Sequence, residues 1–247
     1  MGTAPAVDNT FYDKLGEAWY DGENVAIAIL KHESGFKNPW VQEQIQSALG
    51  REPVTALDVG CGGGFLSNYL AQQGHATLGL DASFTSVRVA ARHGEGRARY
   101  AQGDACRLPF PDRSVSVVCA MDLLEHIETP AALVAEAARV LKPGGLFFFQ
   151  TYNRTPLAYV LFVWAVNRTP GAVPNTHVYR LFIKPSELRA HCAANGLEFR
   201  TVTGFKLGLN RAALNALRGR FDDIAGFRYQ FTSSLAAGYM GCAQKVR

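Results

Sequence analysis

The chain has 247 residues, of which 48% are hydrophobic and 19% charged, so it can bury a full core and is not a disordered polypeptide. Its formal net charge of +4 is mild and its basic residues are scattered, which argues against a nucleic-acid partner. The five cysteines are an odd number without a CxxC pair, a usage typical of reduced thiols in the cytosol. The N-terminus has no apolar signal core, so we expect a cytoplasmic protein.

Residues 1–50 are predicted to form a helical cap that precedes the first strand. Apolar residues recur at helical spacing, with Asp8 or Asn9 able to cap a first helix and Asn24 a second. A third helix is predicted to begin at Pro39, because proline is favoured in a first helical turn. The aromatic residues of this cap are more typical of a core than of a site, and none is predicted to be catalytic.

From residue 54 onward the apolar pattern alternates between strands and helices, as in a parallel sheet. The predicted strands lie near 54–59, 76–80, 98–102, 115–120, 146–151, 197–204 and 236–244. The predicted helices lie near 64–73, 83–93, 130–141 and 185–194. We therefore expect one α/β domain over 1–247 with a mostly parallel sheet of seven strands. Its parts are the cap, a cofactor-binding core at 51–152, a lid or insert at 153–184 and a C-terminal part of the sheet at 185–247.

The first strand runs into DVGCGGG at residues 58–64, where an acid is followed by four glycines in five positions. Glycine permits positive φ and lets a ligand approach the backbone closely. A dinucleotide fingerprint would need glycine where Phe65 stands, and the charge of Asp58 would repel a pyrophosphate by about 1 kcal/mol or more. The ammonium and sulfonium groups of S-adenosylmethionine suit this acid better. The loop therefore predicts that methyl donor.

Two further acids follow the next two strands. Asp81, which precedes Ala82, lies at the usual distance for holding ribose hydroxyls. Asp104, which precedes Ala105, can accept a hydrogen bond from the adenine amine or can cap the short turn that follows it. Both positions fit an adenosyl ligand.

The segment MDLLEH, residues 121–126, follows the fourth strand and should face the crevice beyond the carboxyl ends of the strands. If it forms one helical turn, Asp122, Glu125 and His126 share one side of that turn. Two carboxylates and an imidazole suit a divalent cation. The alternative is that Glu125 and His126 orient the start of a helix and bind no ion.

The run Pro156–Val166 contains eleven residues without a charge. It is too short to span a bilayer, which takes about twenty residues. It predicts either a buried lid helix or an element that enters a membrane interface to collect an apolar substrate. Arg154 and Arg168, which flank the run, are compatible with anionic headgroups, so we expect a cytoplasmic protein with peripheral contact at the inner membrane.

Taken together, DVGCGGG, Asp81, Gly103-Asp104 and the LKPGG at 141–145 make the chain similar to the class I S-adenosylmethionine-dependent methyltransferases over about residues 50–152. More narrowly, it resembles the ubiquinone-biosynthesis O-methyltransferases. The matching segments are LDVGCGGG (57–64), MDLLEH (121–126), NR (153–154), TH (176–177), FIKPSEL (182–188) and YM (239–240), whereas 205–235 matches poorly.

The resemblance implies a Rossmann-like fold and O-methylation of a phenol or catechol, such as a polyprenylated ubiquinone precursor. The residues that would bind the methyl donor are Asp58, Gly60, Cys61, Gly62, Gly64, Asp81, Ala82, Asp104, Ala105 and Met121. By the same resemblance Asp122, Glu125 and His126 would hold a divalent cation, Mg or Zn, and would be catalytic together with His177. Asp122 stands where the family has glutamate, which shortens one arm of this set.

Three alternatives remain open at this point. His126 or His177 could take the acceptor proton without a metal. The same fold could methylate an amine or hydroxyl of a secondary metabolite without a metal. A non-catalytic module could also keep the methyl-donor site as a ligand sensor.

Overall fold

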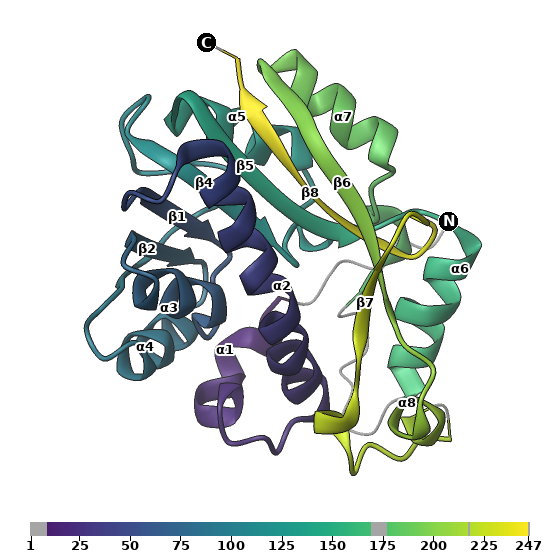
Figure 1. The fold of residues 1–247 in the computed structure, drawn as a ribbon. Coiled ribbons are helices and arrows are strands. Elements are labelled where there is room, and N and C mark those ends of the chain that lie inside the picture. The colour runs from purple at the N-terminus through teal and green to yellow at the C-terminus, as the bar shows by residue number, and fades with distance from the viewer. Residues whose placement is uncertain (1–8, 169–176, 217, 247) are drawn as a thin grey trace, which may run out of the picture.

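The computed structural model describes residues 9–168, 177–216 and 218–246 (Figure 1). The strands are β1 Thr55–Val59, β2 Ala76–Asp81, β3 Arg99–Gln102, β4 Val115–Met121, β5 Leu141–Tyr152, β6 Leu197–Leu207, β7 Tyr229–Thr232 and β8 Gly238–Lys245. The helices are α1 Phe11–Leu15, α2 Val25–Leu49, α3 Phe65–Gln72, α4 Phe84–His93, α5 Pro130–Val140, α6 Pro156–Tyr159, α7 Pro185–Ala194 and α8 Arg211–Ala216.

The strands form one sheet in the order β3-β2-β1-β4-β5-β8-β6-β7. β1 to β5 pair in parallel, and β8 lies antiparallel between β5 and β6. This confirms the Rossmann-like, mostly parallel fold. The chain order reverses between β1 and β4, which is where such sheets open a ligand crevice. The expected number of seven strands is wrong for the described residues, which form eight. The added strand β7 has only four residues, too few to show a period.

The predicted helical cap is present, but its division into helices differs from the prediction. Asn24 does cap a helix, accepting a hydrogen bond from the Ile27 amide at 3.1 Å. That helix, α2, continues through Pro39 to Leu49, so the predicted start of a separate helix at Pro39 is wrong. The ring of a helical proline crowds the carbonyl four residues earlier, here that of Gly35. The burial of residues beyond the proline, such as Ile45, offsets the missing hydrogen bond. Asp8 lies outside the described residues.

The two faces of the sheet have separate cores, and β5 contributes to both by alternation. Phe147 and Phe149 pack with Leu133 of α5 and Leu188 of α7 on one face. Phe148 packs on the other face, with residues of α2 and α3. All three phenylalanines are fully buried, as the continuous apolar run predicts for a central strand. Residues 142–145, between these phenylalanines and the start of β5, form an irregularity where the pairing with β4 shifts register.

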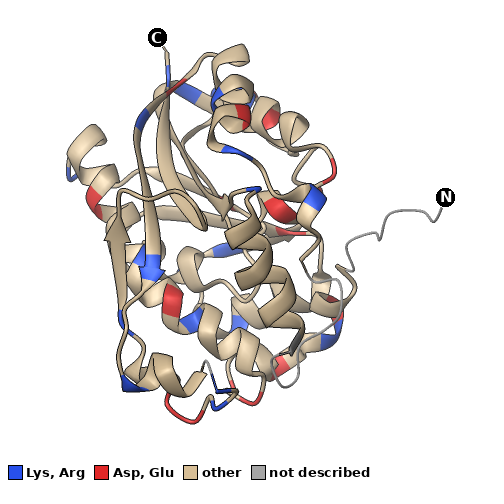
Figure 2. Cartoon of the chain, turned by 90° about the vertical axis from the view of Figure 1, so that its right-hand side faces the viewer, with Lys and Arg blue, Asp and Glu red and all other residues tan. Residues whose placement is uncertain are grey.

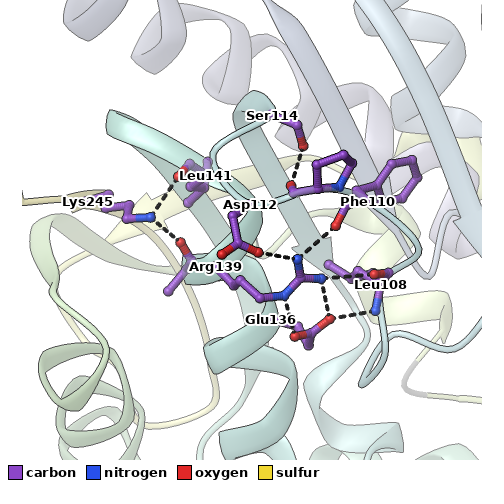
Figure 3. Close-up of polar contacts among 10 residues, drawn as sticks. Leu108, Phe110, Asp112, Ser114, Glu136, Arg139, Leu141 and Lys245 are labelled. Carbon is purple, nitrogen blue, oxygen red and sulfur yellow. Dashed lines mark hydrogen bonds and ion pairs between the residues drawn. The ribbon is translucent and has the colours of Figure 1, made fainter.

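The connection from β3 to β4 is fixed to α5 by one arginine (Figure 3). Arg139 donates to the Leu108 carbonyl at 2.9 Å and to the Phe110 carbonyl at 2.8 Å. Its ion pairs with Glu136 and Asp112 lie at 2.7 and 2.8 Å. This single side chain therefore orders the apolar loop that the sequence shows as LPFPD.

The apolar segment after β5 is helical, as α6 followed by a π-helical turn over Val160–Ala165. Its large side chains Leu157, Tyr159, Val160, Leu161 and Trp164 are between 40% and 49% exposed, so a buried lid helix is wrong. Figure 2 looks onto this side of the molecule, where the segment carries no charged residue. Within the described parts of the chain, no helix combines the length and the apolar content that crossing a membrane requires.

Candidate functional site

The glycine loop between β1 and α3 has the backbone that its sequence predicts. Gly60, Gly62 and Gly64 adopt φ values of 71°, 50° and 83°, in the left-handed region. A Cβ added to Gly62 would lie 2.6 Å from the ring of Trp19, which covers the loop. The loop therefore has no space for a side chain at Gly62, and no larger residue could replace Gly62 without moving Trp19.

Asp58 lies beneath this loop. Its carboxylate is 3% exposed and accepts a hydrogen bond from the Ser67 hydroxyl at 2.6 Å. Burial raises the pKa of Asp58 to about 7. Cys61 is buried beside it, and burial raises the pKa of that thiol as well. The two residues therefore support the loop from inside, and a direct contact of Asp58 with the methyl donor remains a prediction.

Asp81 joins the loop to the start of α4. One carboxylate oxygen accepts from the Gly62 amide at 2.9 Å and the other from the Ser83 amide at 2.8 Å. Burial raises the pKa of Asp81. Asp81 thus lies at the end of β2 with its carboxylate directed toward the glycine loop. There it could also accept hydrogen bonds from ribose hydroxyls.

The remaining predicted adenosine residues lie at the same edge of the sheet. Ala82 and Asp104 are exposed, while Ala105 and Met121 are partly buried. Asp104 accepts a hydrogen bond from the Cys106 amide at 2.8 Å, which is the capping arrangement that the sequence also allows. The contact of Asp104 with adenine remains a prediction.

The segment after β4 does not form the expected helical turn. Asp122 has φ of 54°, in the left-handed region, and a 3₁₀ turn begins only at Leu124. Because of this, Asp122 is not among the metal-ligating side chains that converge with Glu125 and His126. The predicted set of three is therefore not brought together in one cluster.

Asp122 is paired with a lysine that sequence reasoning missed. The Lys37 ammonium, from α2, binds the Asp122 carboxylate and lies 3.0 Å from Glu33 Oε1 and 3.3 Å from Gln150 Oε1. Lys37 is only 2% exposed. Burial by itself favours the neutral amine, but the carboxylates of Asp122 and Glu33 outweigh it and raise the pKa of Lys37. Only the tertiary fold shows this pair, since its members are 85 residues apart.

His177, and not the predicted Asp122, is the third residue that converges with Glu125 and His126. One ligand atom from each of Glu125, His126 and His177 lies within 4.8 Å of the others. Glu125 Oε2 accepts from the Thr151 hydroxyl at 2.8 Å. Glu125 Oε1 and His126 Nδ1 are buried and have no hydrogen-bond partner among the described residues. Buried polar atoms normally have partners, so these two atoms are available to bind water, an ion or a substrate group.

The protonation states of this cluster follow from burial. Burial lowers the pKa of His126 to about 3 and that of His177 to about 4, so both imidazoles are neutral near pH 7. Burial, with the charge of Asp122 adding to it, raises the pKa of Glu125 to about 8. Neutral imidazoles are the form that accepts a proton or binds a metal.

The sequence predicts that the aromatic residues of the cap belong to the core. Tyr12 does pack against the buried cluster of Leu15, Trp19 and Ile27, but it also contacts the site. Its ring lies 5.8 Å from the His126 ring, edge to face, and 6.0 Å from the Trp19 ring, stacked on it. The sequence gives no signal for this, because Tyr12 falls outside the helical spacing of Phe11, Leu15 and Trp19.

Comparison with known proteins supports the resemblance to methyltransferases. A family model described as "Methyltransferase domain" matches residues 57–149. The chain is 33% identical to a ubiquinone biosynthesis O-methyltransferase of Leptothrix cholodnii, over 79% of this chain and 84% of the relative. It is 34% identical to a protein of that name from Azotobacter vinelandii, over 78% of this chain and 83% of the relative.

Solved structures share the fold at lower identity. The magnesium protoporphyrin IX methyltransferase of Synechocystis superposes with a TM-score of 0.64 and 19% identity, over 96% of this chain and 95% of that chain. A SAM-dependent methyltransferase from Methanosarcina mazei superposes with a TM-score of 0.56 and 20% sequence identity, over 79% of this chain and 93% of that chain. With the glycine loop, Asp81 and the polar cluster beyond β4, these similarities show that the chain is an S-adenosylmethionine-dependent O-methyltransferase and belongs to the ubiquinone biosynthesis O-methyltransferase family.

Proposed function

We propose that the chain methylates a hydroxyl group of a phenol or catechol, and that a polyprenylated ubiquinone precursor is the acceptor. The observation that carries this proposal is the buried cluster of Glu125, His126 and His177 with its two unpartnered atoms. A neutral phenol is a poor nucleophile, so the acceptor hydroxyl needs a group that takes or displaces its proton. The names of the relatives support the same acceptor class.

We further propose that this cluster holds a divalent cation. Two neutral imidazoles and one carboxylate form a set that suits zinc better than magnesium, which prefers oxygen ligands. Glu125 Oε1 and His126 Nδ1 would supply the atoms that lack partners. When bound, such an ion lowers the pKa of an attached hydroxyl. Asp122 is already neutralised by Lys37, so His177 is the better third ligand.

The chain's own residues orient and protect the acceptor in this scheme. Thr151 fixes Glu125 through the 2.8 Å hydrogen bond, and the Lys37–Asp122 pair fixes the backbone beside it. Without an ion, the Nδ1 lone pair of His126 could hold the acceptor proton. Burial of the cluster excludes water, so a phenolate formed there would remain poorly solvated and nucleophilic.

Labelled S-adenosylmethionine tests this function with a panel of catechols, monophenols and amines, with and without EDTA. We expect catechols to be preferred, EDTA to abolish turnover, and added zinc to restore it. Because the raised pKa of Glu125 lies at about 8, its carboxyl group ionises as pH rises through that value, and metal-dependent turnover should rise between pH 6.5 and pH 8.5.

Glu125→Gln keeps a partner for Thr151 but loses the ionisable ligand, and we expect it to lower kcat at least 100-fold. The surface variant His93→Ala serves as the control, since His93 lies on α4 away from the cluster. Turnover of amines alone, unaffected by EDTA, would instead assign the metal-free N-methyltransferase alternative.

We also propose that the segment 156–166 contacts a membrane and that the protein acts at the cytoplasmic side of the inner membrane. Its exposed apolar side chains form an uncharged surface next to the acceptor site, since Phe162 stacks on Tyr152 and its carbonyl lies 3.1 Å from His177 Nδ1. A polyprenylated acceptor would need such an entrance.

Co-sedimentation with vesicles of phosphatidylethanolamine and phosphatidylglycerol tests this contact. The double variant Val160→Asp, Leu161→Asp should lose vesicle binding, because both side chains are at least 40% exposed and would carry charge into the interface. Leu209→Asp, at a site 81% exposed on another part of the chain, should bind as the unaltered protein does. Equal sedimentation of all three proteins, each shown to be folded, would exclude the segment as the contact.

A further inference from the structure

Tyr12 connects the two halves of the site. Trp19 covers Gly62 and Gly63 of the loop, and Tyr12 stacks on Trp19 with an interplanar angle of 16°. Tyr12 also meets His126 edge to face, at 86°. The aromatic row thus runs from the glycine loop through Trp19 and Tyr12 to His126 of the acceptor cluster.

Acidic residues from both halves of the site affect the pKa of the Tyr12 side chain. After burial, which has the largest effect, the charges of Glu125, Asp122 and Asp81 raise the pKa of Tyr12. Asp81 belongs to the end that binds the methyl donor, whereas Glu125 and Asp122 belong to the acceptor end. Tyr12 is therefore a neutral phenol placed between the two.

The position of Tyr12 is fixed from both sides. The Ser86 hydroxyl, on α4, donates to the Tyr12 carbonyl at 3.3 Å and accepts from the Trp19 indole at 3.1 Å. Asn9 donates to the His126 carbonyl at 3.3 Å. Tyr12 nevertheless keeps part of its surface exposed, unlike the fully packed side chains of the sheet. An aromatic ring that is held between the glycine loop and the acceptor cluster, and is not fully buried, can attract a cation bound there.

We propose that the Tyr12 ring contacts the sulfonium end of the methyl donor and thereby distinguishes the charged donor from its neutral product. An aromatic ring attracts a cation by about 0.5–2 kcal/mol, and this attraction disappears when the sulfonium becomes a thioether. Tyr12 thus favours binding of S-adenosylmethionine and release of S-adenosylhomocysteine. The inference rests on the methyl donor of the family and is independent of the acceptor proposed above.

Calorimetric titration of both ligands, without an acceptor, tests this inference in the full chain. We expect Tyr12→Leu to weaken S-adenosylmethionine about 3- to 30-fold and S-adenosylhomocysteine less than about 2-fold. Tyr12→Phe, which keeps the ring, should retain the selectivity between the ligands. Phe11→Leu is the matched control on the same helix, since Phe11 packs on Tyr12 with centroids 5.5 Å apart.

Fluorinated phenylalanines at position 12 provide a second test if Tyr12→Leu does not fold. Fluorine withdraws charge from the ring face with little change of shape, so affinity for S-adenosylmethionine should fall stepwise with fluorine number while that for the product stays constant. Equal weakening of the two ligands would assign Tyr12 a purely structural role and overturn the proposal. So would an unchanged affinity ratio in every variant.

Discussion

Replacing Lys37 with methionine should lower the free energy of unfolding by about 3 kcal/mol, because it leaves the largely buried carboxylates of Asp122 and Glu33 without their shared partner. Lys37 is 2% exposed and contacts Asp122, Glu33 and Gln150 at once. Urea denaturation followed by circular dichroism measures the loss. Lys31→Met is the matched control on α2, and since Lys31 is exposed we expect a change within about 0.5 kcal/mol.

A double variant distinguishes the contribution of the Lys37–Asp122 ion pair to stability from that of the packing around it. Lys37→Met combined with Asp122→Asn removes both charges, and asparagine tolerates the left-handed backbone at position 122. We expect the double variant to recover at least half of the stability lost in Lys37→Met. If instead the two losses simply add, the contribution of Lys37 comes from its packing and the ion pair is not the cause.

Replacing Asp81 with alanine should weaken S-adenosylmethionine binding by about 2–4 kcal/mol, or roughly 30- to 1000-fold. The carboxylate accepts hydrogen bonds from the amides of Gly62 and Ser83. Its removal therefore releases the glycine loop and the start of α4, together with the predicted contact to the ribose. Calorimetry with the methyl donor measures the effect. Asp222→Ala, at an exposed acid, should bind as the unaltered protein does. Retention of affinity in Asp81→Ala would mean that the ribose is held elsewhere.

Much of the fold could be predicted because its signals are local. The apolar runs of β1, β4 and β5 are buried on both faces and stand out without alternation. The glycines of the loop predict positive φ, which the structure has at Gly60, Gly62 and Gly64. β7 was missed because four half-exposed residues carry no period, and they form a strand only by pairing with β6.

The candidate site was harder to predict because its members meet only in three dimensions. Glu125 and His126 were found from their position after a strand, but their third partner depends on the backbone of Asp122, whose left-handed φ no local pattern indicates. Lys37 and Tyr12 come from the cap, where helical spacing predicts only a core. Long-range ion pairs and ring contacts of this kind leave no trace in a single sequence.

The backbone at residue 122 also limits how this enzyme could be redesigned. A φ of 54° is tolerated by glycine, asparagine and aspartate, but it is unfavourable for β-branched or bulky side chains. Most replacements of Asp122 should therefore lower the free energy of unfolding by about 1–2 kcal/mol, and directed evolution toward new acceptors will advance faster through its neighbour Leu123, whose side chain contacts the loop at Gly60. The backbone geometry that separates Asp122 from the cluster of Glu125, His126 and His177 thus also restricts the substitutions that position 122 accepts.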